Sequence, residues 1–450
     1  MVRISLFIFI CIIGIRCTSS TDNKVISGNP TKPISNDSLL NLLQYHTFLY
    51  FWDGAEPISG AARERYHADG SFPESENTIV TIGGTGFGLM ALIVGIEREF
   101  ISREEGINRF NKILTFLEKS DRFHGVWPHW LDGKTGTTKP FSQKDDGADL
   151  VETSFLAQGL ITARQYFQNG SIPEKHLADR FDRLWRDINW AWHTRGENVL
   201  YWHWSPKYEW EMNFKIQGYN ECLITYVLAA SSPTYPITPK VYHEGWAKNG
   251  AIKNNISHSQ YGYHLSLQHN GNSQYGGPLF WSHYSFLGLN PNNLVDQYAN
   301  YWEHNVNHTL INYSWCVENP KKYKGYGKSN WGLTSSYSPN GYAGHAPGEN
   351  DLGVISPTAA ISSIPYTPEK SMQVIRDLYK HLGDKVWGKY GFYDAYSEEK
   401  NWFPKQYLAI DQGPMIIMIE NYRSGLLWDL FMSAEEVKKG LDALEFYTDG

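Results

Sequence analysis

Cysteine is scarce in this sequence, and no arrangement of cysteines suggests metal binding. Only four cysteines occur in 450 residues, and neither a paired CxxC motif nor an HExxH motif is present. Cys11 and Cys17 lie near the N-terminus. Cys222 and Cys316 lie far apart within helical patterns, which is typical of small buried apolar residues, with a disulfide the less favoured alternative. No metal and no other cofactor is therefore predicted.

Clusters of positive charge and nucleotide-binding or nucleophile motifs are also missing. The net charge is −7 without a basic stripe, which argues against a nucleic-acid partner and favours an uncharged one. No GxSxG nucleophile motif occurs. The run Gly83–Gly88 lacks the GxGxxG spacing and a preceding strand, so its glycines indicate close helix packing rather than phosphate binding.

Long apolar runs are confined to the N-terminus. Residues Ile4–Ile15 follow Arg3 and predict a signal peptide over residues 1–17, too short for a membrane anchor. Cys17 occupies the place of a lipoprotein cysteine, but Arg16 stands where a small residue is usual, so lipidation of Cys17 stays open. We expect an exported protein, with the membrane involved only through such an anchor.

The rest of the chain predicts one large all-α domain. Residues 18–37 are interpreted as a flexible segment and residues 38–450 as a single domain, because no Pro-rich or Ser-rich linker follows residue 38. A monomer is expected. Apolar residues recur with helical spacing in about twelve segments. These lie near residues 39–51, 89–96, 107–117, 149–168, 174–194, 218–231, 238–249, 295–318, 356–365, 368–382, 411–425 and 433–446.

Long Gly-rich and aromatic loops separate alternate helices. This alternation predicts an (α/α)6 toroid barrel, with six inner helices around a funnel and with aromatic-rich loops and short hairpins on one rim. The stretch 251–290 has little helical pattern and is interpreted as an extended insertion at that rim. The chain contains 17 Trp and 29 Tyr, and such flat amphipathic rings suit the apolar faces of sugars as well as a large core.

Carboxylates next to these aromatic loops are the candidate catalytic groups, because glycoside hydrolysis needs an acid and a carboxylate. Asp145, Asp149 and Glu152 precede or open one helix. In the simplest structural interpretation, Asp149 caps that helix and Glu152 completes a capping box. Glu221 stands among rings, which would raise its pKa, or it complements a helix dipole. Asp411 introduces an apolar helix and could be an ordinary N-cap.

Five motifs that follow one another along the chain carry a specific family resemblance. They are Asp145-x3-Asp149-x2-Glu152, Gly218-Tyr-Asn-Glu221, the run 277–288, Asn330-Trp-Gly-Leu-Thr334 and Ala409-Ile-Asp-Gln-Gly-Pro-Met415. Together they resemble the glycoamylase-like family of bacterial glycoside hydrolases, over about residues 38–432. Members act on β-1,2-glucan, either internally or by releasing sophorose from a chain end.

The resemblance implies an (α/α)6 barrel and hydrolysis with inversion. It places Glu221 at the general-acid position and Asp145, Asp149, Glu152 and Asp411 among the essential acids. Asp411 is the preferred base and Asp149 the competing one. The residues expected to bind sugar are Trp331, Tyr342, His283, Trp204, Trp130 and Tyr219. The expected location is the periplasm or the outer membrane of a Gram-negative bacterium.

Three alternatives remain at this point. The first is a glycosidase for another glucan linkage on the same fold. The second is a uronate lyase or sugar epimerase, which the scarcity of Arg in the aromatic loops disfavours. The third is a noncatalytic glycan-binding lipoprotein. Internal and terminal cleavage are both left open, because loop shape decides between them.

Overall fold

The computed structural model describes residues 34–71, 76–255, 259–271 and 274–448. The chain divides into Met1–Ser35 and a compact unit, Asn36–Gly450. The predicted signal peptide, Cys17 and most of the predicted segment 18–37 lie outside the described residues. Within the described part, no helix combines the length and apolar character needed to cross a membrane.

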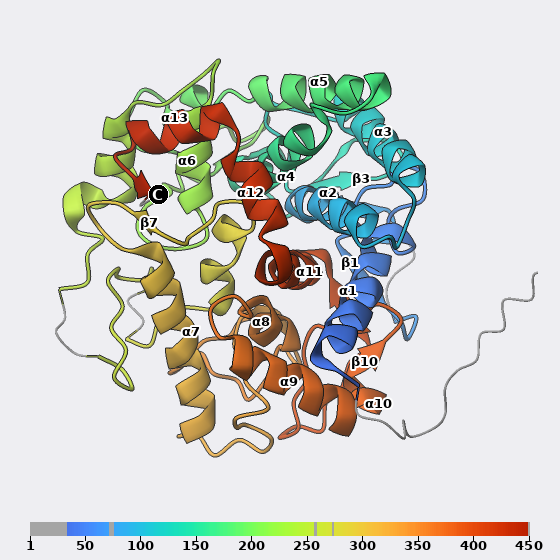
Figure 1. Cartoon of the computed structure of the whole chain (residues 1–450). Coiled ribbons are helices and arrows are strands. Elements are labelled where there is room, and N and C mark those ends of the chain that lie inside the picture. Colours follow the sequence, from blue (N-terminus) through green and yellow to red (C-terminus); the bar gives the residue numbers. More distant parts are fainter. Residues whose placement is uncertain (1–33, 72–75, 256–258, 272–273, 449–450) are drawn as a thin grey trace, which may run out of the picture. The chain divides into compact units, whose positions relative to one another are not determined.

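Six inner elements form the centre of the unit 36–448 (Figure 1). α2 packs against α4 on one side and α11 on the other, α4 packs against α6, and α8 packs against α11. Two successive 3-10 turns complete this ring between α6 and α8. The inner elements are α2 (Ile82–Glu97), α4 (Leu150–Phe167), α6 (Leu223–Ser231), the turns Leu279–Ser282 and Tyr284–Phe286, α8 (Pro357–Ser362) and α11 (Ala409–Ser424).

Outer helices alternate with the inner elements along the chain. In sequence order they are α1 (Asn36–Trp52), α3 (Arg103–Lys119), α5 (Ile172–Arg186), a π-helical turn (Val241–Trp246), α7 (Tyr301–Glu318) and α9 (Pro368–His381). α10 (Gly383–Val386), α12 (Leu426–Met432) and α13 (Glu435–Ala443) are additional helices. The predicted (α/α)6 arrangement is therefore confirmed.

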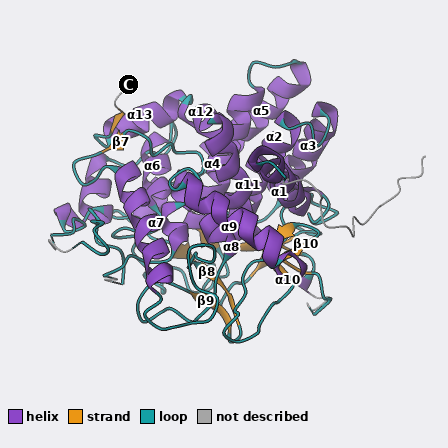
Figure 2. Ribbon diagram, turned by 60° about the horizontal axis from the view of Figure 1, so that its bottom comes forward, coloured by secondary structure: helices purple, strands orange, loops and turns teal. Residues whose placement is uncertain are grey.

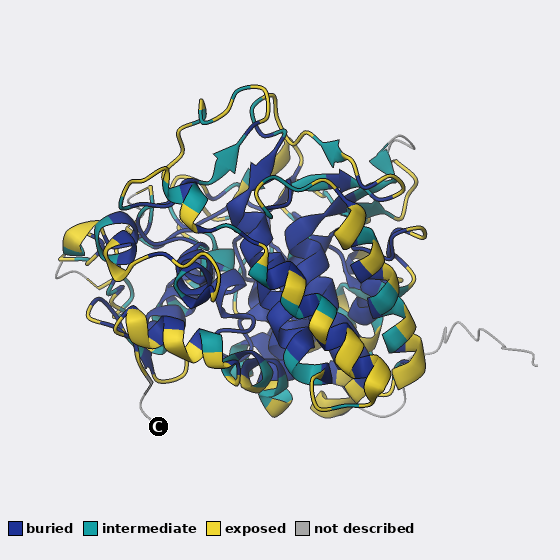
Figure 3. Ribbon diagram, turned by 90° about the horizontal axis from the view of Figure 1, so that it is seen from above, coloured by how far each residue is buried: buried dark blue, intermediate teal, exposed yellow. Residues whose placement is uncertain are grey.

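Burial separates the two layers, as expected for a double ring of helices. α2 is buried on all sides except at its last residue, whereas α3, α5 and α9 expose one face, so Figure 3 shows dark blue helices inside striped ones. α2 and α4 cross at Gly86 and Gly159. A Cβ on Gly86 would lie 2.2 Å from the carbonyl oxygen of Phe155, so only glycine fits there. The glycine run 83–88 thus serves helix packing, as predicted, although the expectation that no strand precedes it is wrong, because the strand Ile79–Thr81 leads into α2.

Most of the short strands and long loops gather at one rim of the ring, whereas the strand at β7 lies apart, near the C-terminus (Figure 2). Three strands lead directly into inner helices: β2 into α2, β5 into α4 and β12 into α11. The antiparallel pairs are β1 (Arg65–His67) with β12 (Gln406–Leu408), β5 (Ala148–Asp149) with β6 (His203–Trp204), β8 (Ser335–Ser338) with β9 (Gly341–Gly344), and β10 (Trp387–Gly388) with β11 (Gly391–Phe392). β3 (Trp130–Asp132) pairs with β2 (Ile79–Thr81) and β4 (Thr138–Lys139), and β7 (Leu294–Val295) pairs with β13 (Tyr447–Thr448).

Several predicted boundaries differ from the structure. The segment 174–194 ends as an α-helix at Arg186, the segment 218–231 begins at Leu223, and the segment 238–249 is mainly one π-helical turn. The predicted rim insertion 251–290 is wrong in its last part, because Leu279–Phe286 are turns of the inner ring. Their apolar side chains are mostly buried, and turns this short give no helical period. Cys222 and Cys316 are free and buried, as predicted.

Candidate active site

A cavity of about 620 Å³ lies where the inner elements begin. Residues at or just before the starts of five inner elements line it, namely Thr81, Glu152, Glu221, Phe280 and Ile410. Because a helix N-terminus carries a partial positive charge, this rim favours the gathering of carboxylates. The rest of the wall is Glu64, Arg65, His129, Trp130, Phe141, Asp145, Val151, Phe155, Trp202, His203, Met212, Phe214, Tyr284, Ser335, Tyr337, Tyr342 and Leu408.

Asp149 lies beneath this wall and is fully buried. It is the N-cap of α4, and its Oδ1 accepts hydrogen bonds from the backbone N–H groups of Val151 and Glu152, each at 3.0 Å. The indole Nε1–H of Trp202 donates to the same oxygen at 2.9 Å. Burial opposes its charge, but the hydrogen bond from His129 and the other donors outweigh burial and lower the pKa of Asp149. Asp149 therefore stays ionised with both oxygens engaged.

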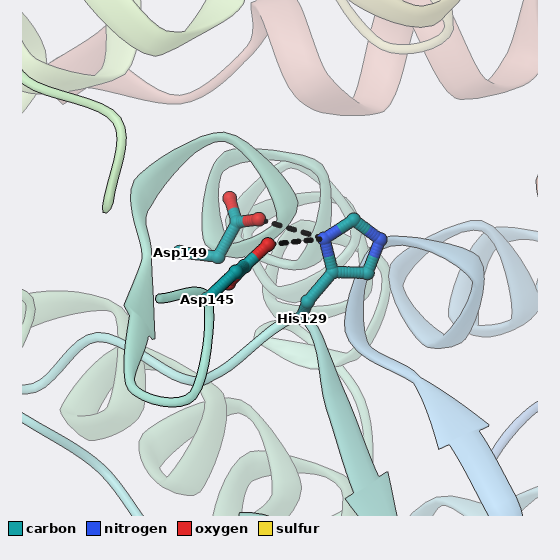
Figure 4. A group of neighbouring side chains, drawn as sticks. All are labelled: His129, Asp145 and Asp149. Atoms are coloured by element: carbon teal, nitrogen blue, oxygen red, sulfur yellow. Dashed lines mark hydrogen bonds and ion pairs between the residues drawn. The ribbon is translucent and has the colours of Figure 1, made fainter. Parts of the chain in front are cut away.

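His129 joins three of the predicted carboxylates. Its Nδ1 lies 2.8 Å from Asp149 Oδ2 and 3.6 Å from Asp145 Oδ2, as Figure 4 shows, and its Nε2 lies 3.9 Å from Glu152 Oε1. Burial opposes the imidazolium form, but the surrounding carboxylates prevail and raise the pKa of His129 well above its usual value. The ring stacks on Phe141 with centroids 4.1 Å apart. The site thus contains a cation supplied by the protein itself.

Glu152 faces the cavity rather than its own helix N-terminus. Its Oε2 accepts hydrogen bonds from Gly83 N at 2.8 Å and Thr81 Oγ1 at 3.3 Å, both at the start of α2. Burial raises the pKa of Glu152 to about 7, against the opposing effect of His129. The predicted capping box is wrong, because the side chain bridges two inner helices instead. A Cβ on Gly83 would lie 2.6 Å from Oε2, so glycine there makes the contact possible.

Glu221 is a half-buried carboxyl in the cavity wall, just before α6. Its backbone oxygen accepts a hydrogen bond from the Ser285 hydroxyl, which ties it to the 3-10 turns. Burial raises the pKa of Glu221 to about 7, and the charges of Glu152 and Asp149 add to that effect. A carboxyl with this pKa is protonated in a substantial fraction of molecules at neutral pH and can donate a proton.

Asp411 lies behind the wall rather than in it. It is the third residue of α11 and is 3% exposed, so the predicted N-cap role is wrong. Its Oδ1 accepts a hydrogen bond at 3.3 Å from the hydroxyl of Tyr284, which does line the cavity. Its Oδ2 has no ordinary donor, and the carboxyl of Asp394 lies close enough to interact with the Asp411 side chain. Burial and Asp394 raise the pKa of Asp411 well above its usual value.

The predicted sugar-binding aromatics divide into two groups. Trp130 and Tyr342 line the cavity, and the Tyr342 side chain on β9 is 57% exposed. Trp331 is fully buried in a hydrophobic core that it shares with residues of α8 and α9, and it packs against Tyr313 on α7. Trp331 is therefore not available as a platform in this structure, because core packing occupies its faces.

Three further predicted sugar contacts also lie away from the cavity wall. His283 is buried with its Nε2 2.9 Å from Ser363 Oγ, and burial lowers its pKa to about 3. Tyr219 is fully buried, and its hydroxyl donates to Asn305 Oδ1 at 3.0 Å. Trp204 packs edge-on against Trp192 on the outer side of β6. Sequence position next to a motif did not reveal which way these rings point.

Several cavity residues were not predicted from the sequence. The aromatic loops had been identified, but not His129 or Trp202 within them. Phe141 and Phe214 are each 50% exposed at the cavity, and an exposed Phe beside aromatic loops is a usable signal. Asp394 lies in the loop 389–396, which looked like a hairpin, and only its long-range contact with Asp411 identifies it.

One grouping among the described residues has the geometry for a metal ion. Donor atoms of His129, Asp145 and Asp149 lie within 4.8 Å of one another. The imidazole nitrogen that would bind such an ion is already 2.8 Å from an Asp149 oxygen, and the protonated ring supplies positive charge there. The protonated His129 thus offsets part of the negative charge of this grouping.

Comparisons with known proteins agree with this fold and arrangement. The family model "Glycoamylase: Putative glucoamylase" matches residues 213–435. An endo-β-1,2-glucanase from Chitinophaga pinensis, solved with sophorotriose and glucose, is 63% identical; the match covers 92% of this chain and 99% of that chain, with a TM-score of 0.91. The chain belongs to the glycoamylase-like family of glycoside hydrolases.

A second relative and a neighbour in fold are also similar to this chain. An exo-β-1,2-glucooligosaccharide sophorohydrolase from Parabacteroides distasonis is 43% identical over 442 residues. The match covers 95% of this chain but spans only 60% of the length of that curated relative. An endo-β-1,2-glucanase from Talaromyces funiculosus is 11% identical with a TM-score of 0.67 over 92% of this chain and 91% of that one, which is a likeness of fold.

Proposed function

We propose that this chain hydrolyses β-1,2-linked glucan or gluco-oligosaccharides with inversion of the anomeric centre. The Chitinophaga and Parabacteroides relatives, named for internal and terminal cleavage of such glucans, support the linkage. The cavity supports a neutral sugar, because its one arginine, Arg65, is paired with Glu64, while the rings of Trp130, Tyr342 and Phe214 offer stacking surfaces.

The observation that carries the proposal is the Glu221 carboxyl, held in the cavity wall with a pKa of about 7. As the general acid, Glu221 donates its proton to the glycosidic oxygen as the bond from that oxygen to the anomeric carbon breaks. At neutral pH the protonated fraction is large enough for catalysis, whereas a carboxyl with an ordinary pKa would be almost fully ionised.

Asp411 is the proposed base, acting through Tyr284. A water molecule attacks the anomeric carbon from the opposite face and gives a proton to the Tyr284 oxygen, while the Tyr284 hydroxyl passes its own proton to Asp411 Oδ1, 3.3 Å away. This route explains how a carboxylate behind the wall can serve the cavity. The competing base, Asp149, is a weaker candidate because donors occupy both of its oxygens and its pKa is lowered.

The test is product analysis of the purified chain on β-1,2-glucan, β-1,3-glucan, cellulose and starch. We expect β-1,2-linked products alone, with Glu221→Gln lowering kcat by about 10²–10⁴-fold. Tyr284→Phe tests the relay and should lower kcat with little change in KM. Cleavage of starch alone would overturn the linkage, and binding without turnover by the parent would favour the glycan-binding alternative.

The location of the protein is a separate proposal. We infer export from the apolar segment that ends before Cys17, with the periplasm or outer membrane as destination. Fractionation of expressing cells, with and without Cys17→Ser, tests it. Loss of membrane association in the variant would indicate a lipid at Cys17, and retention of both forms in the cytoplasm would contradict export.

A further inference from the structure

Two buried carboxyl groups, those of Asp394 and Asp411, meet behind the cavity wall, and no local sequence pattern predicts their contact. Asp394, after β11, is fully buried, and its Oδ2 accepts a hydrogen bond from the backbone N–H of Tyr337 at 2.8 Å. Its Oδ1 and the Oδ2 of Asp411 are both shielded from solvent and have no ordinary donor. Each carboxyl shifts the pKa of the other through a close side-chain contact, so the two unpartnered oxygens are placed to share a hydrogen bond.

A hydrogen bond between two carboxyl groups requires a proton, because ionised carboxylates only accept. One proton held between Asp394 and Asp411 satisfies both orphaned oxygens. Without it, two buried negative charges would face each other with nothing to compensate them. The pair therefore carries one negative charge and one proton.

The neighbours of the pair do not offer another source of compensation. Charged and titratable groups approach from each packed element: Tyr284 from the 3-10 turns, Tyr337 from β8, Tyr342 from β9, and Glu64 before β1. Glu64 adds negative charge, and the nearby cation Arg65 is already paired with it. The proton between the two carboxyls is thus the local counter-charge.

We propose that Asp394 is a positioning residue for the hydrolytic reaction, sharing one proton with Asp411 so that the pair keeps a single negative charge directed at Tyr284. The inference rests on the proposed function, since it assigns the base to a carboxyl pair. In the reaction, the pair accepts the proton that Tyr284 relays from water, and it returns that proton to solvent after product leaves. No electron transfer or further reactant is involved.

The shared proton is tested without substrate. Infrared spectra at pH 8.5 should show one more protonated carboxyl in the parent than in Asp394→Asn, since an amide cannot hold the proton. The same signal should be missing in Asp411→Asn. Between about pH 4 and 8, the unfolding free energy of the parent should fall with pH by one proton's slope more than that of Asp394→Asn. Equal spectra and equal slopes would overturn the shared proton.

The positioning role is tested kinetically with two variants. Asp394→Ala should lower kcat at least tenfold with KM within about threefold, because Asp411 loses its partner. Asp394→Asn should restore part of kcat, since its amide can donate to Asp411 while its carbonyl still accepts from Tyr337. Unchanged kcat in Asp394→Ala, or equal losses in both variants, would overturn the role.

The two levels of failure are distinguishable. If the parent cleaves β-1,2-glucan but lacks the infrared signal, the carboxyl pair is refuted and the proposed function stands. If the signal is present and the parent cleaves no glucan, the shared proton stands, and its catalytic use is refuted together with the proposed function.

Discussion

Neighbouring carboxyl groups in this site differ in pKa, because all of them are shielded from water but hydrogen-bond donors reach them unequally. Glu152 and Glu221 both have pKa values raised to about 7, whereas Asp149 beside them has a lowered pKa. The difference follows from donors: Asp149 receives three hydrogen bonds at one oxygen, whereas at Glu221 burial and negative neighbours outweigh a single backbone donor. Neighbouring carboxyls thus differ in protonation at neutral pH: Asp149 is ionised, whereas Glu221 is protonated in a substantial fraction of molecules.

Removing the raised carboxyl should stabilise the protein at high pH. The folded pKa of Glu221 is about 7 against 4.5 in an unfolded chain, so the folded state loses stability as pH rises from 4.5 through 7. Glu221→Gln should therefore gain about 1–3 kcal/mol at pH 8 and almost nothing at pH 4. Urea unfolding at both pH values measures this. The exposed Glu349→Gln is the control and should change neither; an equal gain at both pH values would contradict the argument.

The charge on His129 should depend on Asp149. Asp149→Asn keeps an oxygen that can cap α4, but it removes the anion 2.8 Å from the imidazole. We expect the pKa of His129 to fall, which NMR titration of the imidazole can follow, and unfolding to cost about 1–3 kcal/mol less at pH 7. Asp146→Asn is the control: this carboxyl lies three residues before Asp149 in the sequence, and its loss should leave the imidazole titration as in the parent. An unchanged His129 in Asp149→Asn would show that another group holds its proton.

At this scale the sequence could identify the acids but not their contacts. Glu221, Glu152, Asp145 and two exposed or half-exposed rings, Trp130 and Tyr342, were predicted and line the cavity. Trp331 and His283 were predicted for the site and are buried in the core, because motif position does not report side-chain direction. Asp394 has no local signal at all, since its partner is distant in sequence.

Inner helices bring the site residues together because their backbones can approach closely. The crossing of α2 and α4 depends on Gly86 and Gly159, where a Cβ on Gly159 would lie 2.3 Å from the Gly86 carbonyl oxygen. The same two helices supply Gly83 N and Glu152, which form a hydrogen bond of 2.8 Å. Packing distance between the helices therefore controls the position of a carboxyl in the cavity.

A methyl group at this crossing should damage both stability and catalysis. Gly86→Ala would push α2 and α4 apart, with an expected loss of about 2–4 kcal/mol in the free energy of unfolding and a lower kcat through displacement of Glu152. Gly383→Ala is the matched control, since a Cβ there meets nothing within 4 Å. Denaturant unfolding and kinetics measure both variants. If Gly86→Ala unfolds like the parent, the helices have room that the structure does not show.

Long helices were predictable whether exposed or buried, whereas the short inner turns were not. Amphipathic outer helices such as α3 and α9 leave a clear apolar period, and the long inner helices α2 and α4 are rich in apolar residues. The inner 3-10 turns at Leu279–Phe286 were mistaken for part of a rim insertion. They are short and held by contacts distant in sequence, such as the bond from Gln158 Nε2 to Tyr284 O at 3.1 Å.

The molecule as a whole is acidic, yet its cavity wall carries the mixed charges of a site for neutral ligands. Arg65 is paired with Glu64, and His129 with three carboxylates. Long-range attraction of a charged substrate is therefore not expected. This agrees with the sequence, in which no basic stripe was found.

Cleavage should accordingly be insensitive to salt. For β-1,2-glucan, kcat/KM should vary by less than about twofold between roughly 20 and 500 mM NaCl, because no exposed charge pair guides the substrate. Initial rates at low substrate concentration measure this ratio. A steep fall with salt would indicate that the natural ligand is anionic.

The ring closes only when its last inner helix is in place. α11 packs against both α1 and α2, and it brings Asp411 behind a wall to which Asp145 also belongs. A ribosome adding about 5–20 residues per second needs on the order of tens of seconds to travel from one aspartate to the other. During that interval the apolar flanks of α2 and α4 are exposed in the nascent chain, and the site is still incomplete. The site in this architecture is therefore completed late in synthesis, and the apolar surfaces of the half-built ring need shielding until α11 is in place.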